Sequence, residues 1–147
     1  MKYFIKLNVF SILYALMIFF PIQLMGNVYR VSRLTGWNIG TVNTLSGVTI
    51  VGGFIFGTIL IIYLTKKWMK GRKSNFLTTI LWIPYFVLFI YIIASLFPIT
   101  YGGDAPNPVT GFFVIVGLIV FPFYILIINI ISLPCNDDRN KSIANIQ

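Results

Sequence analysis

The chain has 147 residues, of which 58% are apolar, 17% are aromatic and only 10% are charged, and its net charge is +8. Soluble domains average roughly 45–50% apolar and 25% charged residues, so this composition argues against a protein that folds in water. The chain has no histidine and a single cysteine, Cys135, which excludes an internal disulfide, a CxxC redox pair and a thiolate metal cluster. We therefore expect no metal and no cofactor.

Four stretches without a charged residue divide the chain. They span residues 7–25, 45–65, 76–99 and 111–133, which is 19, 21, 24 and 23 residues. About 20 residues at ~1.5 Å rise each cross a hydrocarbon layer ~30 Å thick. Helices are predicted because lipid cannot satisfy backbone polar groups and the stretches lack the ~10-residue alternation of barrel strands. We predict an all-α, polytopic integral membrane protein: one domain, 1–147, folded as a bundle of four transmembrane helices.

The first stretch follows Lys2 and Lys6, as the apolar part of a secretion signal follows its basic part. The residues after it offer no small-x-small cleavage site, because Leu24 and Met25 are bulky. We therefore expect an uncleaved membrane anchor.

Residues 26–44 connect the first two stretches and contain Arg30 and Arg33. Basic and aromatic residues of this kind are typical of the membrane interface. We predict a short interfacial helix that ends at Gly36 or Gly40.

The second stretch contains Thr49, Gly53 and Gly57, which are spaced by four and so share one helix face. Small residues let another helix approach closely, which matters because lipid provides no hydrophobic drive for helices to associate. We predict close packing here, either with a helix of the same chain or between protomers of an oligomer.

The segment 66–75, KKWMKGRKSN, is predicted to be a basic loop. Its five basic residues are Lys66, Lys67, Lys70, Arg72 and Lys73. With Lys2, Lys6, Arg139 and Lys141 they place nine basic residues on one predicted side, against only Arg30 and Arg33 on the other. Short basic loops stay in the cytoplasm, so we predict a multi-pass protein of the cell (inner, cytoplasmic) membrane with both termini cytoplasmic.

The simplest role of this basic loop is to set the orientation. The alternative is that it also binds anionic lipid heads at the cytoplasmic face, at about 1 kcal/mol per basic residue. A short loop attached to the bilayer at both ends lacks the folded basic surface that nucleic acid requires, so no nucleic-acid partner is expected.

The four stretches contain no Asp, Glu, Lys, Arg or His, the residues that mark ion and proton pathways in membranes. The polar side chains expected in their cytoplasmic half are Asn8, Ser11, Thr58, Thr78, Thr79 and Asn129. A lone amide in hydrocarbon should face other helices, where a hydrogen bond to a hydroxyl contributes about 0.6–2 kcal/mol. We expect Asn129 to be structural. The alternative is an intramembrane polar site for a small solute or lipid, made of Asn129, Ser11, Thr58 and Thr79.

Residues 100–110, YGGDAPNPVTG, are turn-forming throughout. Asp104 is the only acidic residue on its predicted side, so we expect an ion pair with Arg30 or Arg33. We expect this pair to be exposed and therefore weak. The polar segment 134–147 is predicted to be a disordered tail.

Ligand-spaced carboxylates, a glycine-rich phosphate loop and a serine elbow are all missing from the sequence, so no catalytic residue is predicted. The first hypothesis is an oligomeric, non-enzymatic membrane protein that acts by helix–helix or lipid contact, such as an immunity or defence component or an accessory subunit of a bacterial membrane complex. Its partner would be itself or another membrane protein. The alternative is an oligomeric channel or facilitator for a small neutral solute or ion.

Overall fold

The computed structural model describes residues 2–69 and 76–132. Within these residues the chain is 89% helical and contains no strand. In chain order the elements are α1 (Lys2–Gly26), α2 (Val28–Thr35), α3 (Ile39–Leu64), the π-helical turn η1 (Thr65–Met69), α4 (Thr78–Leu96), the 3-10 turn η3 (Gly102–Asp104) and α5 (Pro108–Ile131). The all-helical class and four helices long and apolar enough to cross a membrane are confirmed. The side on which each terminus lies stays a prediction.

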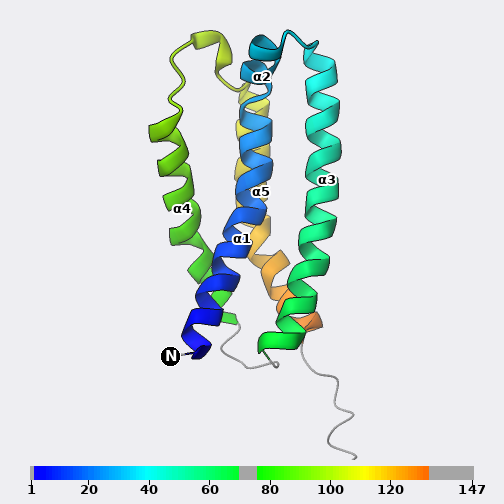
Figure 1. The fold of residues 1–147 in the computed structure, drawn as a ribbon, viewed down its shortest axis with the longest axis vertical. Coiled ribbons are helices and arrows are strands. Elements are labelled where there is room, and N and C mark those ends of the chain that lie inside the picture. The colour runs from blue at the N-terminus through cyan, green and yellow to red at the C-terminus, as the bar shows by residue number, and fades with distance from the viewer. Residues whose placement is uncertain (1, 70–75, 133–147) are drawn as a thin grey trace, which may run out of the picture.

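The long helices run along a common direction (Figure 1). The short helix α2 and the α4–α5 connection lie at one end of the bundle, which we call the α2 end. The N-terminus of α1 and the turn η1 lie at the opposite, N-terminal end, where the Lys6 ammonium donates a hydrogen bond of 3.2 Å to the Trp68 carbonyl.

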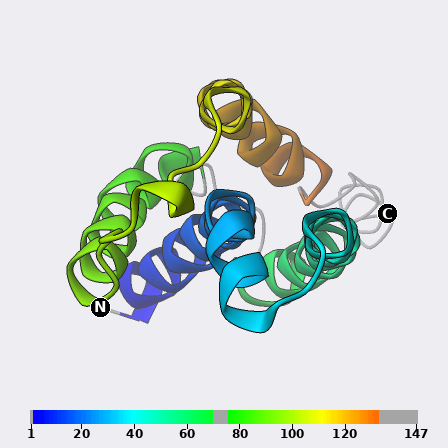
Figure 2. The same ribbon diagram turned by 90° about the horizontal axis from the view of Figure 1, so that it is seen from above.

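α1 is the central helix of the bundle. It contacts α3, α4 and α5, and in the view along the bundle it lies between α3 and α4 (Figure 2). Six of the eleven buried side chains in the hydrophobic core belong to it: Leu7, Phe10, Tyr14, Ala15, Met17 and Ile18. Among the described helices, α1 therefore occupies the middle of the bundle.

Aromatic rings join the core across helices. The Trp82 ring of α4 meets the Phe121 ring of α5 edge to face at 5.0 Å, and Tyr14 of α1 meets Phe121 at 6.4 Å. Such pairs contribute about 0.5–1.5 kcal/mol beyond the burial of their area. The outward faces carry exposed large apolar side chains instead, among them Phe56, Tyr91 and Phe123. An apolar surface of this extent is typical of contact with lipid rather than water.

Besides α1, which begins at Lys2, two helices begin before the apolar stretches that predict them. α3 starts at Ile39 because Asn38 caps it, its side-chain oxygen accepting a hydrogen bond of 2.8 Å from the Gly40 N–H. α5 starts at Pro108, whose fixed φ suits the first helical position. Both starts lie among uncharged polar residues, where the hydropathy pattern gives no signal.

The first residues of the predicted basic loop are helical. Residues 65–69 continue α3 as a π-helical turn, so Lys66 and Lys67 are helical and exposed. Lys70, Arg72, Lys73 and the predicted tail lie outside the described residues.

Candidate functional site

The predicted packing strip on α3 divides into two parts. Gly57 is half-buried, and a Cβ at this position would lie 3.4 Å from the Met17 side chain of α1. Thr49 and Gly53 are exposed, and a Cβ at Gly53 would meet nothing within 4 Å. Gly57 therefore serves contact within the chain, whereas the Thr49 and Gly53 part of the strip is open to the surroundings of the bundle.

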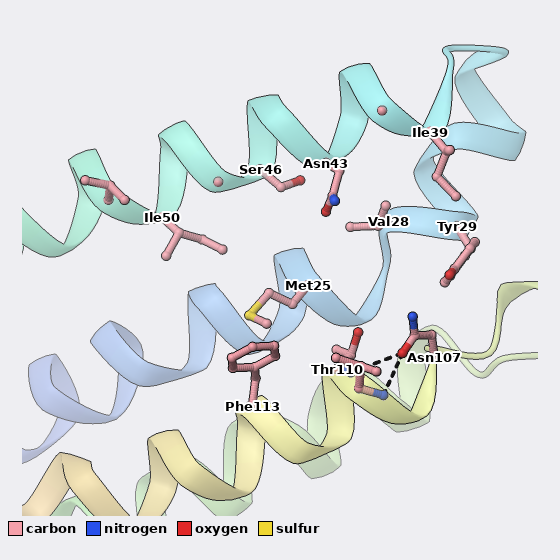
Figure 3. Close-up of a pocket in the computed structure, with 14 residues that line it drawn as sticks. Met25, Val28, Tyr29, Ile39, Asn43, Ser46, Ile50, Asn107, Thr110 and Phe113 are labelled. Atoms are coloured by element: carbon pink, nitrogen blue, oxygen red, sulfur yellow. Dashed lines mark hydrogen bonds between the residues drawn. The ribbon is translucent and has the colours of Figure 1, made fainter.

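A cleft of about 630 Å³ lies between α3 and α5 at the α2 end (Figure 3). α3 forms one wall and the start of α5 the opposite wall. The junction of α1 and α2 closes the back with Met25, Val28 and Tyr29. In the part of the chain that the structure describes, no element covers the fourth side, so the cleft opens sideways between α3 and α5.

The cleft changes from polar to apolar along its depth. Asn43 of α3, and Asn107 and Thr110 of α5, lie near the α2 end, whereas Ile50 and Phe113 lie deeper in the bundle. The Asn107 side-chain oxygen accepts a hydrogen bond of 2.6 Å from the Val109 N–H, so the same residue caps α5 and lines the cleft. This order is the one expected of a bundle that crosses a membrane, where amides favour the interface and apolar groups favour the hydrocarbon.

An ion pair joins α2 to the α4–α5 connection. Arg33 donates from Nε to Asp104 Oδ1 at 2.9 Å and from Nη2 to Asp104 Oδ2 at 2.7 Å. Arg30 Nε lies 3.8 Å from the same Oδ2 atom. The expectation of an exposed pair was wrong for the acid, because Asp104 is only 2% exposed beneath α2. The hydrogen bonds from Arg33 hold the pKa of the Asp104 carboxyl below its ordinary value, and the charges of Arg33 and Arg30 lower that pKa further.

Arg30 also binds the end of α4. Its Nη1 and Nη2 atoms donate to the carbonyls of Phe97 at 3.1 Å and Pro98 at 2.7 Å. The last carbonyls of a helix have no partner within it, so a guanidinium is a suitable cap. Arg33 in turn lies over the Tyr101 ring, 5.1 Å from its centre. The two arginines fix α2 to the α4–α5 connection.

The intramembrane polar residues have separate hydrogen-bond partners. The Asn129 amide donates to the Thr78 hydroxyl at 3.1 Å, joining α5 to α4. Thr58 lies 2.7 Å from the Tyr124 hydroxyl and thereby joins α3 to α5. Ser11 instead donates to the Leu7 carbonyl of its own helix, at 2.9 Å.

Four buried hydroxyls have no hydrogen-bond partner among the residues described. They belong to Tyr14, Thr65, Thr79 and Ser132. The structure thus brings Asn129 to Thr78, whereas the Thr79 hydroxyl has no partner among the described residues.

Two tyrosines that the sequence analysis did not single out make contacts between helices. Tyr85 of α4 donates its hydroxyl to the Asn8 side chain of α1, and Tyr124 bonds Thr58. The available signal was their position inside apolar stretches, because a buried tyrosine hydroxyl usually finds a partner.

Known proteins provide no guide to the role of these features. No protein-family model, curated protein or solved structure matches the chain. In residues 2–69 and 76–132, no group of three His, Cys, Asp or Glu side chains lies close enough to hold a metal ion. The geometry of the cleft and of the exposed helix faces is therefore the basis for a functional proposal.

Proposed function

We propose that the chain is a non-enzymatic integral membrane protein that acts by contact with another membrane-embedded helix, and that the cleft between α3 and α5 is the contact site. The observation that carries the proposal is this sideways-open cleft in a bundle whose centre is already filled by α1. A solid centre favours action at the periphery over conduction along the axis.

The α3 wall of the cleft supports a helix as the occupant. Gly40, Ser46 and Gly47 line it, and small side chains let two helix backbones approach closely. Asn43 is exposed at the same wall and could hydrogen-bond a neighbouring helix. The helix could belong to a second copy of the chain, or to a larger complex or inserted peptide, as in the immunity or accessory-subunit roles.

Photo-crosslinking from α5 tests this proposal. A benzophenone side chain at Phe113 would face the cleft, whereas the same group at Phe112 would lie at the same depth outside it. Both phenylalanines are exposed, at 57% and 64%, which makes them a matched pair. We expect a protein adduct of discrete mass from position 113 only, and its loss on Gly47→Leu, which fills the cleft.

The mass of that adduct separates the versions of the proposal. Twice the chain mass indicates a homo-oligomer, and any other protein mass indicates a different membrane partner. Equal adducts at positions 112 and 113, or an adduct that persists in Gly47→Leu, would contradict the contact site.

The alternative, an oligomeric channel or facilitator, has one observation in its favour. Among the described residues, the buried hydroxyls of Thr79 and Ser132 have no hydrogen-bond partner, and such groups are the kind that a water-filled path satisfies. Solute flux into proteoliposomes that changes with Thr79→Val would support this reading, whereas flux no greater than in empty liposomes favours the contact protein.

A further inference from the structure

A second groove lies on the other side of α1, between α1 and α4, also at the α2 end. It encloses about 580 Å³ and is separate from the α3–α5 cleft, with which it shares no lining residue. Ile22 of α1 and Ile90 and Ile93 of α4 form its apolar walls, and Arg30 of α2 lines its mouth.

The groove extends from headgroup depth into hydrocarbon. Arg30 lies on α2, beyond the end of the membrane-spanning α1 at Gly26. Ile90 lies seven residues before Phe97 on α4, which corresponds to about 10 Å at ~1.5 Å rise per residue. Half of a hydrocarbon core is about 15 Å thick, so the groove reaches most of the way through one leaflet.

The charge at the mouth is positive. The charged side chains in this region are Arg30, Arg33 and Asp104, so the local sum is two minus one, or +1. Arg33 uses two N–H groups on Asp104, and Arg30 uses two of its five N–H groups on the carbonyls of Phe97 and Pro98, which follow α4. Arg30 covers these carbonyls and retains N–H groups for an anion, and its side chain is 21% exposed.

We propose that this groove binds an anionic glycerophospholipid, with one acyl chain between α1 and α4 and the phosphate at Arg30. An apolar groove open to a bilayer is filled by lipid chains in any case. The guanidinium at headgroup depth makes the site selective, because its planar N–H fork matches phosphate oxygens. The inference does not depend on the proposed function or on which leaflet covers the α2 end.

Photo-labelling of the full chain tests this site. The protein is reconstituted in phosphatidylcholine liposomes that contain a trace of phosphatidylglycerol with a diazirine in its acyl chain, and labelled peptides are mapped by mass spectrometry. A parallel sample uses phosphatidylcholine with the same diazirine chain. We expect labelling of residues 90–97 to be several-fold stronger with the phosphatidylglycerol probe.

Two variants and a control locate the lipid. Arg30→Gln should lower the phosphatidylglycerol signal on α4 to the phosphatidylcholine level. Ala94→Phe fills the groove wall without touching Arg30 and should remove the label, whereas Ser95→Phe adds a similar volume at an exposed position outside the lining and should leave it unchanged. Labelling near Lys66 and Lys67, at the N-terminal end of the bundle, should be the same in all three variants.

Equal labelling of α4 by the two probes would overturn the proposal, as would labelling that persists in Ala94→Phe. If Arg30→Gln does not fold, because Arg30 also caps α4, the Ala94→Phe and Ser95→Phe pair decides the question alone.

Discussion

The amide of Asn129 shows how one polar side chain fixes the contact between two apolar helices. Leu or Ile could pack at many registers along α4, but the bond to Thr78 has one geometry, at 3.1 Å between two buried groups. The sequence predicted that Asn129 would face other helices and bond a hydroxyl. It could not select Thr78, because four hydroxyl side chains share that half of the stretches and only the rotation of α4 about its axis distinguishes Thr78 from Thr79.

We predict that Asn129→Leu and Thr78→Val each lower the stability of the protein in detergent. The coupling between them should be about 0.6–2 kcal/mol, the range for hydrogen bonds between membrane helices. A double-mutant cycle with reversible unfolding in mixed micelles measures this energy. Strictly additive losses would show that the bond contributes nothing.

At the scale of elements, α2 is the part of the fold that depends most on its partners. Its eight residues are too few to form a stable isolated helix, so contacts must hold it. Gly36, with φ of 71°, ends it in the left-handed conformation that glycine adopts readily, which selects Gly36 over Gly40. The two arginines and Asp104 then fix it to the α4–α5 connection.

We predict that acid weakens this attachment. The pKa of Asp104 is lowered in the folded protein, so its contribution to stability is present above the unfolded value of about 4. That contribution is lost as the pH falls through the still lower folded pKa. At pH values below 4, the thermal unfolding midpoint of the protein should therefore fall. Asp104→Asn should lower the midpoint at neutral pH and should remove most of this acid-induced fall.

The Asp104→Asn comparison is needed because other carboxyl groups of the chain titrate in the same range. A variant that retains the full acid-induced drop would show that Asp104 is not its cause.

At the scale of the whole molecule, α1 occupies the centre of the bundle and both the α3–α5 cleft and the α1–α4 groove lie at the α2 end, while the N-terminus of α1 and the start of the basic run share the other end. The Lys6 to Trp68 contact places two basic segments, far apart in the sequence, at the same face of the bundle. Charge at a single end is what sets orientation in a membrane.

We predict that this basic end is cytoplasmic. In a Cys135→Ser background, an impermeant maleimide added to intact cells should label Gly102→Cys at the α2 end and leave Lys67→Cys unlabelled. Changing the other four basic residues of the run, Lys66, Lys70, Arg72 and Lys73, to Gln in these two reporter chains should give mixed or reversed labelling. Labelling of Lys67→Cys in the otherwise unchanged chain would show that the orientation is the opposite one.

The sequence by itself determined the class of fold. The length of an apolar stretch and the lack of charge within it are local properties, and they alone decide whether the stretch can cross the hydrocarbon of a membrane. It also indicated the interfacial helix and the two candidate arginine partners of Asp104. Only the tertiary structure decided that α1 is central, that Gly57 packs inside while Gly53 does not, and that Asp104 is buried. Which face of each helix turns inward is set by the mutual fit of all four, and helices that are apolar all round carry no pattern that could reveal it.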